Sequence, residues 1–175
     1  DAQGAPQSVL EHATGKLLAY TADPAELEFV PGSFTYEPQS KTLFISTSDM
    51  LPATDRYYTV AVRTSSGLYL GKPNRVIVEG LGATGYFRIG ANRNESRPWG
   101  IPWGIALIDP VGCTIRKCTT FLNAGGIVIE HARDTVIEQC VSFGNRSRYE
   151  PGAGNIVSFG GRDELATRNV LIRDC

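Results

Sequence analysis

The second half of the chain repeats itself at an offset of 22 residues. Residues 104–124 align without gaps on residues 126–146, and glycine, isoleucine, cysteine, phenylalanine and asparagine recur at matching positions. A third copy covers residues 67–81, and a fourth, looser copy ends in residues 169–175. Helical repeats need about 33 residues or more, whereas about 22 residues suffice for one parallel β-helix turn of two or three short strands. The repeat therefore predicts an all-β fold, a right-handed parallel β-helix of about four coils.

Stacked coils place equivalent residues above one another, so each column of side chains needs compatible chemistry. One predicted inward column contains Val78, Ile115, Ile137 and Ile172. A second contains Leu81, Cys118, Cys140 and Cys175. The outward column beside the isoleucines contains Glu79, Arg116, Glu138 and Arg173. Its alternating sign lets each neighbouring pair attract, which supports the register. Asn123 above Asn145 predicts an asparagine ladder at a corner.

The first third of the chain shows strands without the repeat. Residues 32–37 and 42–48 alternate and are rich in β-formers, which predicts a hairpin turning at residues 38–41. Further strands are predicted at residues 17–20, 27–30 and 57–65. We therefore expect a small N-terminal β module over residues 1–66, followed by β-helix coils over residues 67–175 that are truncated at the C-terminus. The parent protein is expected to be longer.

Composition excludes several classes of protein. Hydrophobic residues make up 42% of the chain and charged residues 20%, which suits a packed core and argues against disorder. No apolar run approaches the roughly 18 residues of a membrane span. Metal-binding and nucleotide-binding motifs are absent from the sequence, so no cofactor, metal ion, nucleic acid or membrane partner is predicted. The cysteines are expected to be reduced and buried, with a disulfide between coils as the alternative.

The repeats resemble the right-handed β-helix repeat family of the pectate-lyase-like superfamily. Residues 31–49 are similar to the segment that precedes the first coil in secreted bacterial β-helix proteins, including some glycoside hydrolases. The resemblance covers about residues 31–175. It implies a secreted or cell-surface protein that acts on a poly- or oligosaccharide and is a monomer at full length. The same fold serves lyases, hydrolases, epimerases and non-catalytic surface proteins, so the reaction stays open.

Two insertions interrupt the regular spacing. The extra residues fall mainly in 85–103 and 146–153, and both loops are expected to leave the helix at one corner and to wall a groove over the strands around Ile105 and Ile127. The candidate substrate-binding residues are Arg88, Arg93, Arg97, Trp99, Trp103, Arg146, Arg148 and Tyr149. Arginine suits carboxylates and sulfates, and aromatic rings offer flat apolar faces. In the alternative interpretation, the tryptophans pack the loop onto the coil and the arginines are solvated.

The candidate catalytic residues are Asp109, Glu130 and His131. Asp109 and His131 follow the same strand on successive coils, and Lys72 occupies the equivalent position in the preceding copy. A carboxylate beside a histidine or lysine can serve as base or acid in elimination or hydrolysis. The alternative is that Asp109, which precedes Pro110, is a turn residue. The leading hypothesis is a lyase or glycosidase acting on an acidic glycan, and the alternative is a non-catalytic glycan-binding or structural surface module.

Overall fold

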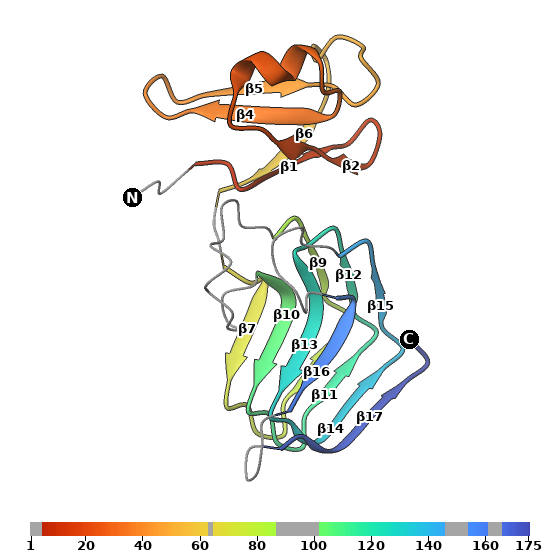
Figure 1. Cartoon of the computed structure of the whole chain (residues 1–175). Helices are drawn as coiled ribbons and strands as arrows, with labels where there is room; N and C mark the ends of the chain where they lie inside the picture. The colour runs from red at the N-terminus through yellow and green to blue at the C-terminus, as the bar shows by residue number, and fades with distance from the viewer. Residues whose placement is uncertain (1–4, 63–64, 87–101, 146–153, 161–165) are drawn as a thin grey trace. The chain divides into compact units, whose positions relative to one another are not determined.

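The computed structural model describes residues 5–62, 65–86, 102–145, 154–160 and 166–175. The chain divides into two compact units, the first comprising the described residues up to 62 and the second beginning at residue 65. Figure 1 shows that strands dominate both units. Within the described ranges, no helix has the length and apolar character needed to cross a membrane.

The first unit contains two three-stranded sheets. The strands of the first sheet are β1 (Ser8–Glu11), β2 (Lys16–Leu17) and β6 (Tyr58–Ala61). The strands of the second are β3 (Ala19–Tyr20), β4 (Ser33–Glu37) and β5 (Thr42–Ser46). In the first sheet the central strand β1 is antiparallel to both neighbours. In the second sheet β4 and β5 form the predicted antiparallel hairpin, with Tyr36 opposite Leu43.

A small core and a short helix complete this unit. The core consists of the buried side chains of Val9, Leu18 and Phe34. Residues 27–30, predicted as a strand, instead lie at the end of the 3-10 helix η1 (Pro24–Glu28). The Asp23 carboxylate accepts a hydrogen bond from the Ala25 amide at 2.9 Å, and a proline in the first turn favours the helical φ. This local capping overrides the β-forming composition of the run.

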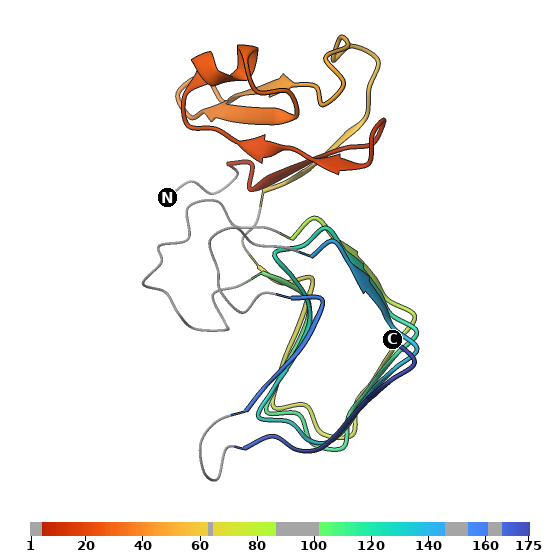
Figure 2. The ribbon, with the colours of Figure 1, turned by 45° about the vertical axis from the view of Figure 1, so that its right-hand side comes forward.

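The second unit is a parallel β-helix, which confirms the predicted fold. Sheet C contains β7 (Leu68–Gly71), β10 (Trp103–Ile108), β13 (Gly125–Glu130) and β16 (Ile156–Phe159). Sheet D contains β8 (Ile77–Glu79), β11 (Thr114–Arg116), β14 (Arg133–Glu138) and β17 (Arg168–Arg173). Sheet E contains β9 (Gly82–Thr84), β12 (Thr119–Phe121) and β15 (Val141–Phe143). Equivalent strands lie side by side in Figure 1, and in Figure 2 the coils lie one behind another with nearly the same outline.

The pairing register confirms the 22-residue offset. Ile105 pairs in parallel with Ile127, and Ile115 pairs with Ile137. All four of these isoleucines are fully buried in the core of the coils. The predicted inward column continues through Val78 above and Ile172 below. Ile172 is 43% exposed because β17 belongs to the last described coil, which has no strand beneath it in the described chain.

The column of cysteines is likewise buried in the inner coils and exposed in the first and last described coils. Cys118 and Cys140 are buried, and each thiol donates to backbone carbonyls of its own coil and of the coil before it. Burial raises the pKa of the Cys140 thiol to about 11, so it is a poor nucleophile. Leu81 and Cys175, predicted to point inward, are exposed, because they stand in the first and last coils. All four cysteines of the chain are free thiols.

Side-chain ladders tie the coils together at their edges. The Asn123 side-chain amide donates to Asn145 Oδ1 at 2.9 Å, and the Asn145 amide donates in turn to Asn155 Oδ1 at 3.2 Å. The predicted ladder therefore exists and has one more member. In the charged column, Arg116 forms an ion pair with Glu79 at 2.8 Å, and Arg173 Nε donates to Glu138 at 2.9 Å. These bonds add to the register that the backbone already fixes.

Left-handed backbone positions mark the corners of every coil. One corner column contains Arg75, Gly112, Asp134 and Asn169, and another contains Gly80, Lys117, Gln139 and Asp174. All eight residues have φ between 49° and 69°. Glycine adopts this region without strain, but most residues in these columns are not glycine. Sharp turning is therefore a property of the corner position and not of one residue type.

The insertions are distributed differently from the prediction. Ile127 pairs with Ile156, an offset of 29 residues, whereas Ile137 pairs with Ile172, an offset of 35 residues. Seven extra residues therefore precede β16, and the remaining six lie between β16 and β17. The spacing of the cysteines cannot show how these extra residues are distributed, because both groups lie between Cys140 and Cys175.

Candidate functional site

The corner between sheets C and D carries a column of chemically reactive side chains. Lys72, Asp109 and His131 follow β7, β10 and β13, and their φ values are 54°, 53° and 51°. The Asp109 amide donates to the Glu130 carbonyl at 2.9 Å, which fixes one corner residue against the next coil. The repeat alignment predicts this column, and the structure contains it. Other corners share the left-handed backbone, so the side chains alone distinguish this one.

The candidate catalytic residues meet at this corner. His131 Nδ1 lies 3.1 Å from Asp109 Oδ1, and His131 Nε2 lies 3.6 Å from Glu130 Oε1. The first distance is a hydrogen bond, and the second is too long for one. The Asp109 side chain is 37% exposed and the Glu130 side chain only 6%. The imidazole therefore lies between a solvated carboxylate and a buried one.

The environment of Glu130 is unusual for an acidic residue. Its Oε2 atom is buried and has no hydrogen-bond partner among the described residues. Burial raises the pKa of Glu130 above its ordinary value; His131 opposes this shift, and the charge of Asp109 adds to it. Glu130 therefore holds a proton more readily than a solvated glutamate does.

This arrangement can perform acid–base chemistry. When His131 Nδ1 donates to Asp109, the imidazole is held in the tautomer whose Nε2 carries a free lone pair. Such an aspartate–histidine pair is suited to act as a general base. Glu130 supplies a carboxyl group of raised pKa close to Nε2. A base and an acid of different proton affinity therefore lie within one cluster.

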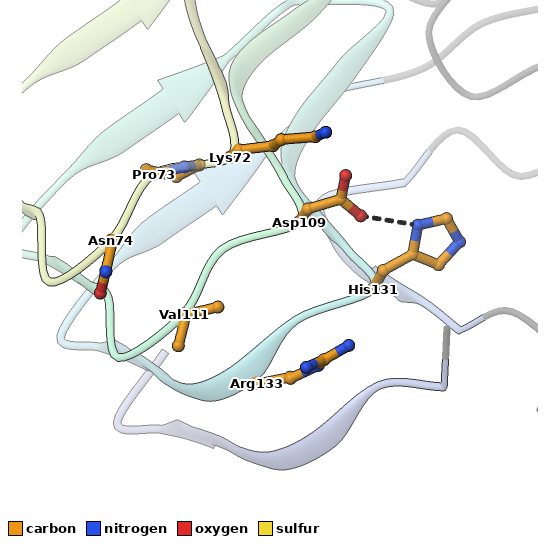
Figure 3. A pocket seen from close by; sticks show the side chains of 7 residues that line it. All are labelled: Lys72, Pro73, Asn74, Asp109, Val111, His131 and Arg133. Atoms are coloured by element: carbon orange, nitrogen blue, oxygen red, sulfur yellow. Dashed lines mark hydrogen bonds and ion pairs between the residues drawn. The ribbon is translucent and has the colours of Figure 1, made fainter. Parts of the chain in front are cut away.

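A pocket of about 370 Å³ opens beside the pair. It is lined by Lys72, Pro73, Asn74, Asp109, Val111, His131 and Arg133. Figure 3 shows the Asp109 carboxylate and the His131 ring turned toward each other, with Lys72 on the preceding turn of the chain. Three coils thus contribute to one pocket.

The sequence did not predict four of the lining residues, namely Pro73, Asn74, Val111 and Arg133. Asn74, Val111 and Arg133 form a second column, because Val111 bridges in parallel to both of the others. Their spacing equals that of Lys72, Asp109 and His131, namely 37 and then 22 residues. The alignment that revealed the first column therefore contained the second as well. The alignment did not show that both columns border the same pocket.

Most of the predicted substrate-binding residues lie outside the described residues. These are Arg88, Arg93, Arg97, Trp99, Arg146, Arg148 and Tyr149. Trp103 is described and is only 1% exposed. Its ring contacts Phe159 edge-on at a centroid distance of 6.3 Å and lies so close to Gly125 that a Cβ there would be 2.2 Å from it. Trp103 is therefore a packing residue in this structure and offers no open face for a sugar.

The predicted groove floor is also closed. All residues of β10 and β13 are buried, including Ile105 and Ile127. Moreover, Trp103 begins β10, directly after the long insertion, whereas Asp109 follows the end of the same strand. A strand of six residues spans about 20 Å. The acid–base cluster therefore lies at the opposite end of β10 from Trp103.

No group of three or more histidine, cysteine, aspartate or glutamate residues in the described ranges is arranged to hold a metal ion. Comparisons with family models, with curated proteins and with solved structures returned no match.

Proposed function

We propose that this chain carries the coils of an extracellular β-helix protein that processes an acidic polysaccharide by elimination or hydrolysis. In this proposal the Asp109–His131 pair is the general base, and Glu130 is the acid. The observation that supports it most is the cluster itself, in which a 3.1 Å aspartate–histidine bond adjoins a buried carboxyl with an unpartnered oxygen. Unsatisfied buried polar atoms are uncommon in folded proteins.

Two further features support a glycan as the substrate. The repeats resemble those of β-helix proteins that act on polysaccharides, and a polymer can lie along a stack of coils. The pocket lining includes Lys72 and Arg133, which suit a uronate carboxylate. Elimination next to a carboxylate is favoured when cations neutralise that group.

A non-catalytic module is the second candidate, and one observation favours it. Asp134 and Asn169 at the neighbouring corner are also joined across coils, by a hydrogen bond of 2.9 Å. The Asp109–His131 bond is of the same kind, so it also serves to join two coils. In this case the pocket would bind a glycan without converting it.

The test is a product assay with acidic and neutral polysaccharides. Hydrolysis releases reducing ends, whereas elimination creates a carbon–carbon double bond that absorbs ultraviolet light. Loss of the general base in His131→Gln or Asp109→Asn should lower the rate about 100-fold or more. The matched control is Asp134→Asn, because Asp134 has the same left-handed backbone at the next corner. Its rate should stay at the wild-type level.

Two results would contradict the proposal. Equal losses in Asp109→Asn and Asp134→Asn would mean that the corner aspartates act only on folding. Binding of acidic glycans with no product in either assay would establish the module instead.

A further inference from the structure

The pocket beside the acid–base cluster has a cationic wall that the proposed proton transfers do not use. Lys72 and Arg133 line it from two coils that are not neighbours, with the coil of Asp109 between them (Figure 3). Lys72 forms no ion pair among the described residues, whereas Lys117, at an equivalent left-handed position of another corner, pairs with Glu79 at 3.1 Å. A lysine that borders a pocket without a carboxylate partner is available to a ligand.

We propose that this pocket binds a single carboxylate group of a ligand through Lys72 and Arg133, and that binding is coupled to protonation of His131. The inference deepens the proposed function and rests on it for the natural ligand, a uronate unit. The binding itself requires no turnover. Asn74 adds an amide donor to the same wall.

The coupling follows from the charges around the imidazole. Among the described residues, the charged groups near His131 are Asp109 and Glu130 from sheet C and, around the pocket, Lys72 and Arg133. With a neutral imidazole, the Asp109 carboxylate repels an incoming anion. A protonated imidazole neutralises Asp109, so this carboxylate no longer opposes binding of the anion.

Linkage then sets the sign of the pH dependence. Because a bound anion stabilises the protonated imidazole, protonation of the imidazole raises the affinity for the anion by the same factor. Affinity for a carboxylate should therefore fall as pH rises and His131 loses its proton. Glu130 acts in the same direction, because its carboxyl, 3.6 Å from His131 Nε2, repels the anion less when it is uncharged.

The chain contains an internal reference for the measurement. It has two histidines, and His12 lies in the first unit, where its Nε2 is 2.8 Å from Thr59 Oγ1. Proton NMR resolves the C2 proton of each ring during a pH titration. Saturating galacturonate should raise the titration midpoint of His131 by about 0.5 pH units and leave that of His12 unchanged.

Three ligands separate the possible sources of binding. Galacturonate carries the carboxylate on a sugar, acetate carries it alone, and galactose is the neutral sugar. Both acids should shift the His131 midpoint. Tighter binding of galacturonate than of acetate would show that the sugar ring contributes. An equal response to galactose, or no response to either acid, overturns the proposal.

Single substitutions test whether Lys72 and His131 are responsible for galacturonate binding and its pH dependence. Lys72→Ala should weaken galacturonate binding about fivefold, whereas the matched control Lys117→Ala should not. His131→Gln should keep weak binding and lose its pH dependence. If Lys72→Ala behaves like Lys117→Ala, the wall is not the site.

The outcome is distinguishable from that of the proposed function. Product formation from a polysaccharide without proton-linked carboxylate binding would refute the inference alone. Proton-linked binding without product from any polysaccharide would refute the proposed function alone.

Discussion

Two buried glutamates, one in each unit, show opposite solutions to the same problem. Glu11 in the first unit is fully buried, and its carboxylate accepts hydrogen bonds from Thr14 at 2.6 Å, from Ser48 and from Arg56 at 3.1 Å. Glu130 in the β-helix is also buried, but one of its oxygens lacks any partner among the described residues. Both oxygens of Glu11 have partners, whereas Oε2 of Glu130 has none among the described residues.

The two environments shift the pKa in opposite directions. Burial alone raises the pKa of Glu11, but the hydrogen bonds from Ser48 and Thr14 and the charge of Arg56 outweigh it, and the pKa falls below its ordinary value. At Glu130 burial prevails and the pKa rises. A compensated carboxylate stabilises a fold, whereas an uncompensated one is retained at a cost in stability, which is typical of functional positions.

The largest expected effect is the loss of Glu11. Glu11→Ala removes the acceptor for Ser48 and Thr14, and it leaves the Arg56 guanidinium, whose side chain is only 12% exposed, with Asp49 at 3.0 Å as its remaining ion-pair partner. Breaking a buried ion pair in this way should lower the free energy of unfolding of the first unit by about 3 kcal/mol. Urea denaturation measures the change. A loss no larger than that of an exposed substitution, such as Glu37→Ala, would show that the network contributes little.

The pH dependence of stability should differ in sign between the two glutamates. The lowered pKa of Glu11 gives stability that is present above its unfolded value, about 4.5, and is lost as pH falls through the folded value. The raised pKa of Glu130 gives stability that is present below about 4.5 and is lost as pH rises through the folded value. Melting curves of wild type, Glu11→Gln and Glu130→Gln across this range test the prediction. Parallel curves would contradict it.

The smallest effect is expected for Glu130→Gln at neutral pH. Glutamine has nearly the same shape and carries no charge, so the free energy of unfolding should stay equal or rise by up to about 1 kcal/mol. The assay is urea denaturation at pH 7 and again at pH 4. A clear loss of stability at pH 7 would mean that Glu130 is compensated after all and resembles Glu11.

The sequence was sufficient to predict the β-helix and its register. Residues that recur at a fixed interval in the sequence become stacked neighbours in the fold, because parallel strands in register pair each residue with its counterpart in the next coil. That is why Ile115 lies above Ile137 and Asn123 above Asn145 as expected. The same arithmetic placed Asp109 beside His131.

Other features depend on the three-dimensional surroundings of a residue, which the repeat interval does not determine. Exposure at the ends of the stack is one example, and it exposes Leu81 although its column is inward. The packing of Trp103 against Gly125 and Phe159 is another, because it depends on the absence of a side chain at Gly125. The missing partner of Glu130 is a third, since it follows from burial and not from residue type.

The recurring left-handed corners separate the geometry of the coil from its chemistry. One such column accepts arginine, glycine, aspartate and asparagine at nearly the same φ, so the backbone path does not depend on which side chain stands there. A single codon change at a corner can therefore introduce a charge, an amide or an imidazole at a fixed spacing of about 4.8 Å from its neighbours. Natural selection can thus vary the reactive groups of such a protein independently of its scaffold, and a protein engineer can do the same.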